Sequence, residues 1–216
     1  INAGLYYIYD GVFKDQAAIA ANSLDYSDIT SNLRPGDMKY KDVDNDGAIT
    51  PNDRVRRDKN TDPTFQGGVN LGLNYKNFDL SVLFQGATGG ELRVGTDESG
   101  AIGNYLHDFY ENRWTVTNPS DVHPRITDRS DQYYSSNNTY WLRSTNYIRL
   151  KNVELGYNFS PTMLEKLKIS NLRFYVSGMN LLTWSKIKVY DPESTNALGQ
   201  YYPQSRVING GVMVSF

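Results

Sequence analysis

The chain of 216 residues has a net charge of −2 and no surplus of basic side chains, which argues against a nucleic-acid partner. Its 17 tyrosines, 8 phenylalanines, 3 tryptophans and 18 glycines favour strands and turns over helices. Cysteine is absent, which excludes a disulfide framework and a thiolate site. No apolar run approaches the roughly 18 residues of a membrane-spanning helix.

The first residues form an apolar, tyrosine-rich stretch that predicts the end of a strand over 1–9. The sequence begins Ile1-Asn2 without a methionine, and we expect it to be a fragment of a longer protein. Asp10-Gly11 predicts a turn. Residues 10–64 then form a long polar connection with a short helix near Asp15–Ala21.

This connection contains a stretch, 42–53, with the spacing of a calcium-binding loop. Alternating aspartates, then a glycine for the sharp turn and a closing carboxylate, arrange oxygen ligands around a hard cation. Converging carboxylates repel one another, and a divalent ion relieves that repulsion. The predicted ligands are Asp42, Asp44, Asp46, the carbonyl of Ala48, Thr50 and Asp53. Ile49 is expected to pack its side chain away from the ion.

Two features bear on what kind of calcium site this is. Asp53 closes the loop where glutamate is usual, and its shorter side chain is less suited to bidentate ligation. Pro35-Gly36 lies just upstream and breaks any entering helix, so the ion would staple a loop and would not drive a helix-pair switch. The alternative is a solvated cluster of aspartate turns, because Asp, Asn and Gly form turns in any case.

Two strands with a period of two follow this connection. Apolar residues alternate with glycine and asparagine over 66–75, and an apolar set at 78, 80, 82 and 84 predicts a second strand over 78–84. Lys76-Asn77 leaves room only for a tight hairpin. Residues 87–143 form a second long polar connection, with a helical turn near Leu106–Trp114.

Three more strands are predicted over 146–159, 172–184 and 204–216, joined by a shorter turn at 160–170 and a loop at 185–203. In the first of them the apolar parity changes after Leu150, which predicts a β-bulge near Lys151-Asn152.

The connections alternate between long and short. In an antiparallel meander alternate connections lie at the same end, so all the long loops emerge from one rim and both short turns from the other. Long loops outside and short turns inside are typical of outer-membrane barrels. The sequence therefore predicts an all-β fold, an antiparallel transmembrane β-barrel segment whose extracellular loops are 10–64, which binds calcium, 87–143 and 185–203.

Several short motifs, in this order across nearly the whole chain, resemble the C-terminal part of SusC/RagA-type TonB-dependent outer-membrane transporters. They are Tyr9–Gln16, Pro35–Asp42 with Asp44–Ile49, Asp62–Gly68, Asn77–Ser81, Asn112–Trp114 with His123–Arg125, Tyr147–Tyr157, Gly178–Leu182, Tyr190–Glu193 and the terminal aromatic Phe216.

The resemblance implies a barrel of about 22 strands, of which this chain would supply the last five and the end of a sixth. It also implies a plug domain and a TonB box upstream, which this sequence lacks. The partners it implies are a SusD-like surface lipoprotein, the TonB system, outer-membrane lipid and a glycan, oligosaccharide or peptide substrate. Its location would be the outer membrane of a Gram-negative bacterium, with the loops extracellular and the C-terminus periplasmic.

No set of side chains predicts an enzyme. Asp97-Glu98 is one acidic pair in a polar loop without positioned partners. The only histidines, His107 and His123, lack ligand spacing and are expected to be hydrogen-bonding loop residues. The alternative to a transporter is a secreted, calcium-stabilised β-rich binding or adhesion module.

Aromatic residues near the strand ends have two interpretations, an interfacial girdle or a platform for sugar stacking. The girdle is favoured because aromatic belts are general in membrane barrels. These residues are Tyr75, Tyr157, Trp184, Tyr201 and Tyr202.

Overall fold

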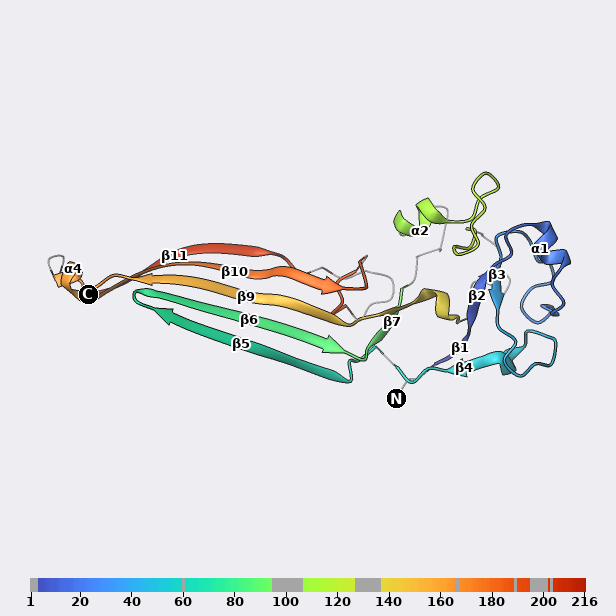
Figure 1. Ribbon diagram of the computed structural model, residues 1–216, viewed down its shortest axis with the longest axis horizontal. Coiled ribbons are helices and arrows are strands. Elements are labelled where there is room, and N and C mark those ends of the chain that lie inside the picture. Colours follow the sequence, from blue (N-terminus) through green and yellow to red (C-terminus); the bar gives the residue numbers. More distant parts are fainter. Residues whose placement is uncertain are drawn as a thin grey trace. The chain divides into compact units, whose positions relative to one another are not determined.

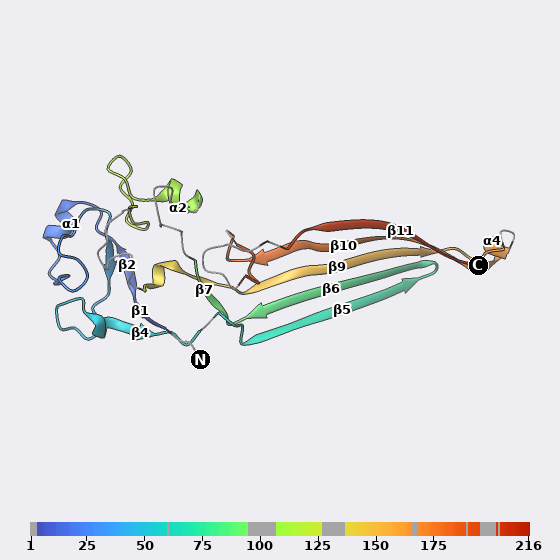
Figure 2. The same ribbon diagram turned by 180° about the vertical axis from the view of Figure 1, so that it is seen from behind.

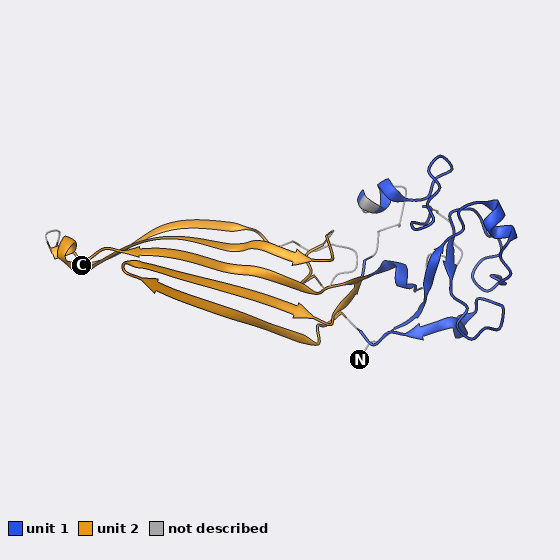
Figure 3. Cartoon of the chain, in the orientation of Figure 1, with its two compact units in different colours: residues 1–60, 93–142, 197–199 blue, residues 61–92, 143–196, 200–216 orange. Residues whose placement is uncertain are grey.

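A computed structural model describes residues 4–59, 61–94, 107–126, 137–165, 168–188, 190–194, 202 and 204–216. Tyr201, Asp97-Glu98 and the first residues of the stretch 1–9 lie outside this description. The chain divides into two compact units, which Figure 3 shows in different colours. The first comprises 1–60, 93–142 and 197–199, and the second 61–92, 143–196 and 200–216.

The second unit is built on one antiparallel sheet of five strands in the order β11-β10-β9-β6-β5 (Figure 1). The strands are β5 (Phe65–Tyr75), β6 (Phe78–Thr88), β9 (Tyr147–Asn158), β10 (Asn171–Ser185) and β11 (Val207–Ser215). Each strand pairs with its neighbour along the chain, so the predicted meander of five strands is confirmed. Lys76 and Asn77 form the tight hairpin, with Tyr75 opposite Phe78.

The sheet has one apolar and one polar face. Residues directly opposite in an antiparallel ladder share a face, and the register places Leu71, Val82 and Val153 side by side. At the adjacent positions of the ladder, the register joins Gly72 to Ser81 and Ser81 to Glu154. Many apolar side chains on the first face are exposed, including Val69, Leu71, Leu73, Ile148, Val176 and Ile208. The alternation in the sequence therefore places the apolar residues on one face of the sheet and the polar residues on the other.

A β-bulge interrupts this register where the parity change predicted it. Leu83 and Phe84 of β6 are consecutive but pair with Asn152 and Leu150, which leaves Lys151 of β9 as the extra residue. On the other side Met179 and Leu182 of β10 pair with the same two residues. Asn180 between them has a positive φ of 53°. The bulge at Lys151 keeps Arg149 and Glu154 on one face although they are an odd number of residues apart.

The short connections lie at one end of this sheet and the ends leading to the long connections lie at the other (Figures 1 and 2). The connection expected as a turn at 160–170 contains a helical turn, α4 (Pro161–Leu164), which begins with proline at its first position. None of the helices in the described ranges is both long and apolar enough to cross a membrane.

The first unit folds around its own core, although most of its residues come from stretches predicted to be polar connections. Its elements are β1 (Leu5–Tyr7), β2 (Tyr9–Val12), α1 (Gln16–Ala20), β3 (Met38–Tyr40), η1 (Pro51–Asp53), β4 (Arg54–Arg56), α2 (His107–Asn112) and η2 (Thr139–Trp141). The two short helices agree with those expected near Asp15–Ala21 and Leu106–Trp114. Two further strands, β7 (Glu91–Arg93) and β8 (Leu142–Ser144), form a separate two-stranded sheet.

The strand expected over 1–9 differs from what is found. β1 pairs with β4 and β2 with β3, so this stretch contributes to two small ladders and not to the five-stranded sheet. Its tyrosines face a local core: Tyr7 is buried, and its ring stacks on Tyr40 with centroids 5.1 Å apart. The apolar pattern does form strands, but its tyrosines pack against aromatic residues of the first unit.

The core of the first unit joins two distant stretches of sequence, 7–49 and 109–141. Its buried members are Tyr7, Phe13, Tyr26, Ile29, Met38, Tyr40, Ile49, Phe109, Tyr140 and Trp141. Polar contacts tie the same stretches together. Arg125 Nε lies 2.9 Å from Oδ1 of the fully buried Asp37, and Asn138 Nδ2 donates to the Tyr40 hydroxyl at 3.3 Å. Most of the described residues of 10–64 and 87–143 therefore belong to one folded unit.

Candidate functional site

The acidic loop of the first unit brings three of its predicted ligands together. One carboxylate oxygen from each of Asp42, Asp44 and Asp46 lies within 4.8 Å of the others. Backbone N–H groups orient these side chains: Asn45 and Gly47 donate to the two oxygens of Asp42 at 2.7 and 3.1 Å. Gly47 adopts a φ of 87°, which glycine allows without strain.

The other predicted side-chain ligands close the loop. Asp53 is fully buried, and its two oxygens accept the N–H groups of Val43 at 2.6 Å and Thr50 at 2.8 Å. The Thr50 hydroxyl accepts the N–H of Asn52, which caps η1. Asp53 is not a member of the acidic group formed by the other three aspartates. It joins the two ends of the loop.

The hydrophobic residue of the loop fixes it to the core. Ile49 is fully buried within the aromatic cluster, as expected for a side chain turned away from an ion. Its N–H donates to the carbonyl of Asp25 at 2.7 Å, next to the bridge between Asp25 and Ala48. The loop is thus anchored on one side and open to solvent on the other.

The electrostatics of the open side favour a cation. Partial desolvation, followed by the neighbouring Asp46 carboxylate, raises the pKa of Asp44 above its ordinary value. A raised carboxyl pKa means that the ionised form is disfavoured where it stands. Three oxygen donors of this kind in one small volume fit the ligand preference of calcium.

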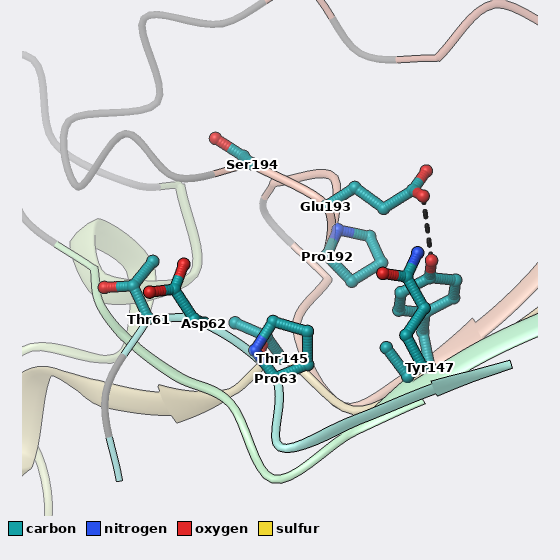
Figure 4. A pocket seen from close by; sticks show the side chains of 10 residues that line it. Thr61, Asp62, Pro63, Thr145, Tyr147, Pro192, Glu193 and Ser194 are labelled. Atoms are coloured by element: carbon teal, nitrogen blue, oxygen red, sulfur yellow. Dashed lines mark hydrogen bonds between the residues drawn. The ribbon is translucent and has the colours of Figure 1, made fainter.

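A second site lies in the five-stranded unit, where a pocket of about 220 Å³ opens at the end of the sheet that leads to the long connections. Pro63, Ala87 and Pro192 supply its apolar surface. Its remaining lining is polar: Thr61, Asp62, Gln66, Thr145, Tyr147, Glu193 and Ser194. Figure 4 shows Thr61 and Asp62 on one side and Glu193 with Tyr147 on the other.

A buried arginine supports one wall of this pocket. The Arg149 side chain is only 1% exposed. Its Nη2 donates to both oxygens of Asp191, its Nη1 to Glu193 and its Nε to Thr183 Oγ1 at 3.0 Å. These contacts bind the segment that follows β10 to strand β9.

Both carboxylate oxygens of Glu193 have hydrogen-bond or ion-pair partners within the protein. Its Oε1 accepts the Tyr147 hydroxyl at 2.8 Å, drawn as a dashed line in Figure 4, and Gln85 Nε2 at 3.3 Å. Its Oε2 accepts Arg149 Nη1 and lies 3.9 Å from Lys151 Nζ. Burial disfavours ionisation of the neighbouring Asp191, but the Glu193 N–H and the Arg149 guanidinium hold the Asp191 pKa below its ordinary value.

This wall was not predicted as a site, although both of its halves lie in motifs noted in the sequence. A signal was present: Arg149 falls in an alternating strand, and two carboxylates, Asp191 and Glu193, follow the next strand. A charge at an inward strand position requires a partner, and the nearby acidic pair was available.

The aromatic residues expected near the strand ends differ in exposure. Tyr75 and Trp184 are 70% and 52% exposed near the ends of β5 and β10, and Tyr202 is 95% exposed. Tyr157 is partly buried and packs on Phe78 with ring centroids 4.9 Å apart. His123 Nδ1 lies 2.8 Å from the Tyr140 hydroxyl, which confirms the hydrogen-bonding role expected for it.

Comparison with known proteins gives relatives of one kind, although no family model matches the chain. TonB-dependent receptor P3 of Formosa agariphila is 34% identical over 166 residues, 74% of this chain and 16% of the relative. TonB-dependent receptor P26 of the same organism is 30% identical over 223 residues, 95% of this chain and 22% of the relative.

Solved structures agree with the curated relatives. The structure of the RagAB peptide transporter matches 100% of this chain and 23% of its own, with a TM-score of 0.72 and 25% identity. The open-open state of the RagAB peptide importer matches 99% and 22%, with a TM-score of 0.70 and 25% identity. The chain spans less than a quarter of the length of these relatives and structures.

An antiparallel meander with one apolar and one polar face, short connections at one end and long ones at the other is typical of one class, the outer-membrane β-barrel proteins. With these relatives and solved structures, the family follows. The chain belongs to the TonB-dependent receptors, as a C-terminal barrel portion of the SusC/RagA type. These relatives are receptors and transporters, which accords with the expectation that the protein is not an enzyme.

Proposed function

We propose that this chain is part of a TonB-dependent outer-membrane transporter that imports glycans, oligosaccharides or peptides together with a SusD-like surface lipoprotein. The TonB system would act through a plug domain and a TonB-binding segment elsewhere in the protein. The observation that carries the proposal is the match of the whole chain, at a TM-score of 0.72, to a structure named as a peptide transporter.

The two faces of the five-stranded sheet support a membrane location. Exposed apolar side chains such as Leu71, Leu73 and Val176 would contact lipid. On the other face Arg173 Nη2 lies 2.7 Å from Glu154 Oε1 and also contacts Asp79. A charged cluster on this side suits a water-filled or plug-filled interior, because charges facing lipid are costly. In this arrangement the long connections are extracellular and the C-terminus is periplasmic.

Fractionation of the native source tests this location. Membranes are separated on a density gradient, and peptides from residues 42–53 and 207–216 are followed by mass spectrometry together with the mass of the intact chain. We expect both peptides in the outer-membrane fraction, in one long chain that co-purifies with a lipoprotein. Recovery of both peptides in a soluble chain of 24.5 kDa would support the secreted binding module instead.

Transport is tested by deleting the gene and growing the strain on defined peptides or oligosaccharides as sole nutrient. We expect uptake of the substrate class to be lost and to return with the intact gene but not with one whose TonB-binding segment is deleted. Uptake that persists without that segment contradicts an energised transporter.

We also propose that calcium binds the acidic loop as a structural ion. The support is the convergence of Asp42, Asp44 and Asp46 and the burial of Ile49 behind them. Asp42, Asp44 and Asp46 would supply carboxylate oxygens, with Ala48, Thr50 and Asp53 completing the set directly or through water. Bound there, the ion would neutralise three carboxylates that otherwise repel one another. The loop would be rigid without any helix movement.

A further inference from the structure

The pocket in the five-stranded unit opens on the polar face of the sheet. Ala87 lies opposite Gln66 on one neighbouring strand and opposite Tyr147 on the other, and all three residues line the pocket. Gln66 has the same parity in β5 as Asn70 and Gly72, opposite to Val69 and Leu71. If the apolar face contacts lipid, as the proposed function requires, this pocket lies on the interior wall near the extracellular end. Imported molecules would pass this position on their way inward.

The polar lining of the pocket combines neutral hydrogen-bonding groups with negative charge. Thr61, Thr145 and Ser194 contribute hydroxyl groups, and Gln66 contributes an amide. Its only formally charged lining residues within the described ranges are Asp62 and Glu193, both acidic. No basic side chain lines the described pocket.

The two carboxylates differ in the hydrogen-bond and ion-pair partners that they already have within the protein. Glu193 receives hydrogen bonds from Tyr147, Gln85 and Arg149, so its charge is matched within the protein. Asp62 is exposed, and no ion pair joins its carboxylate to any residue in the described part of the chain. The unmatched charge of the pocket is therefore that of Asp62.

We propose that this pocket binds a protonated primary amine of the imported substrate, the N-terminus or a lysine side chain of a peptide, with Asp62 as its ionic partner. This inference deepens the proposed transport function and rests on it. An ammonium group is compact and carries three N–H donors in different directions. Asp62 and the hydroxyl of Thr61 offer acceptors of the matching kind.

The apolar part of the lining suits the rest of such a ligand. Pro63 and Pro192 line the pocket, and Figure 4 shows them between the Asp62 side and the Glu193 side. Proline rings are rigid and expose no N–H, so they would pack on the methylene groups that carry a lysine amine. A bound lysine side chain would thus point its ammonium group toward Asp62 and lay its methylene groups along the proline rings.

The test uses the full-length receptor purified in detergent with its surface lipoprotein. Calorimetry measures binding of a lysine-containing tripeptide and of the same peptide acetylated at both amines. Because Asp62 is exposed, we expect Asp62→Asn to weaken binding of the free peptide about three- to tenfold. Raising the salt concentration should weaken the same binding. Acetylated peptide should bind more weakly and respond to neither change.

Asp58→Asn is the matched control, because Asp58 is an exposed aspartate four residues upstream that does not line the pocket. Its peptide affinity should equal that of the wild type. Equal affinities for free and acetylated peptide, or an unchanged affinity in Asp62→Asn, would overturn the proposal. So would binding of a neutral oligosaccharide that falls in Asp62→Asn as the peptide binding does.

Uptake of the same peptide by cells separates this inference from the transport function. If wild-type cells take up the peptide and Asp62→Asn cells do so equally well at limiting concentration, the amine site is wrong and transport stands. If the purified protein binds the free amine through Asp62 but cells show no receptor-dependent uptake, the transport function is wrong and the amine site stands.

Discussion

Arg149 Nη2 lies 2.8 Å from one carboxylate oxygen of Asp191 and 2.9 Å from the other, in a pair whose arginine is almost fully buried. Strand β9 carries the arginine, and the segment after β10 carries the aspartate. The pair fastens that segment to the sheet, and together with the contact between Arg149 and Glu193 it supports one wall of the pocket.

Arg149→Met removes the positive charge and leaves Asp191 and Glu193 facing each other. Breaking a buried pair by removing one partner costs about 3–5 kcal/mol, and we expect a loss of stability of this order. Urea unfolding of the full-length receptor in detergent measures it. Lys151→Met is the control, because Lys151 is partly exposed and 3.9 Å from Glu193. Similar losses in both variants would contradict a special role for Arg149.

The depressed pKa of Asp191 predicts how stability depends on pH. Because the folded pKa is lower than the unfolded one, the contribution is complete above the unfolded pKa and is lost as pH falls through the folded pKa. We expect the stability difference between wild type and Asp191→Asn to be constant near neutral pH and to shrink in acid. Unfolding midpoints of both proteins across this range measure it. A difference independent of pH would contradict the ion pair.

The two faces of the sheet are tested by neighbouring residues in β5. Leu71 is 53% exposed on the apolar face, and Gly72 beside it points to the polar face, where an added Cβ meets nothing within 4 Å. An arginine facing lipid near the bilayer midplane costs about 2–4 kcal/mol, so we expect this loss for Leu71→Arg. Gly72→Arg should cost much less. Refolding into lipid vesicles measures both, and the reverse order would show that the faces are assigned the wrong way round.

The calcium proposal predicts a loss of affinity when one convergent carboxylate is removed. Asp44→Asn should weaken calcium binding at least about tenfold, because affinity in such loops depends on ligand charge. Calorimetry with calcium alone measures it. Asp10→Asn, an exposed aspartate of the same unit outside the loop, should bind as the wild type does. Absence of calcium binding by the wild type would leave the loop as a cluster of aspartate turns.

The raised pKa of Asp44 predicts the opposite effect without the ion. An aspartate whose folded pKa is raised destabilises the fold above that pKa, and the effect disappears as pH falls below the unfolded value. In a chelator, we therefore expect Asp44→Asn to be more stable than wild type at neutral pH, and equal to it in acid. Thermal unfolding at both pH values measures this. A wild type more stable than the variant in chelator would contradict the repulsion.

The five-stranded sheet could be predicted because its residues obey a simple period. Val69, Leu71 and Leu73 alternate with Gly and Asn without exception, so strand, face and hairpin follow from spacing alone. Even the bulge at Lys151 is visible as a change of parity. Only strand ends differed: β6 continues to Thr88, four residues beyond the expected end, because Gln85 to Thr88 pair with β5 although they lack the pattern.

The first unit could not be predicted in the same way. Phe13, Tyr40 and Trp141 occur in stretches with no period, and what buries them is contact across about a hundred residues of sequence. Periodicity reports one face of one element, whereas this core is assembled from short pieces that meet only in the folded chain. The acidic loop was recognisable from its spacing, but the closing role of Asp53 required the positions of Val43 and Thr50.

Residues 7–49 and 109–141 share one hydrophobic core. The two long connections that contain most of these residues therefore depend on each other for folding and are expected to evolve together. Between them in sequence stands the β5–β6 hairpin, so neither loop can reach its native form until the chain on both sides of that hairpin is available. Exchanging one loop with that of another receptor would place foreign side chains against Tyr40 or Trp141 and expose the core. Receptors with altered loops should therefore be constructed by replacing both stretches together. Natural receptors are expected to diversify in the same way.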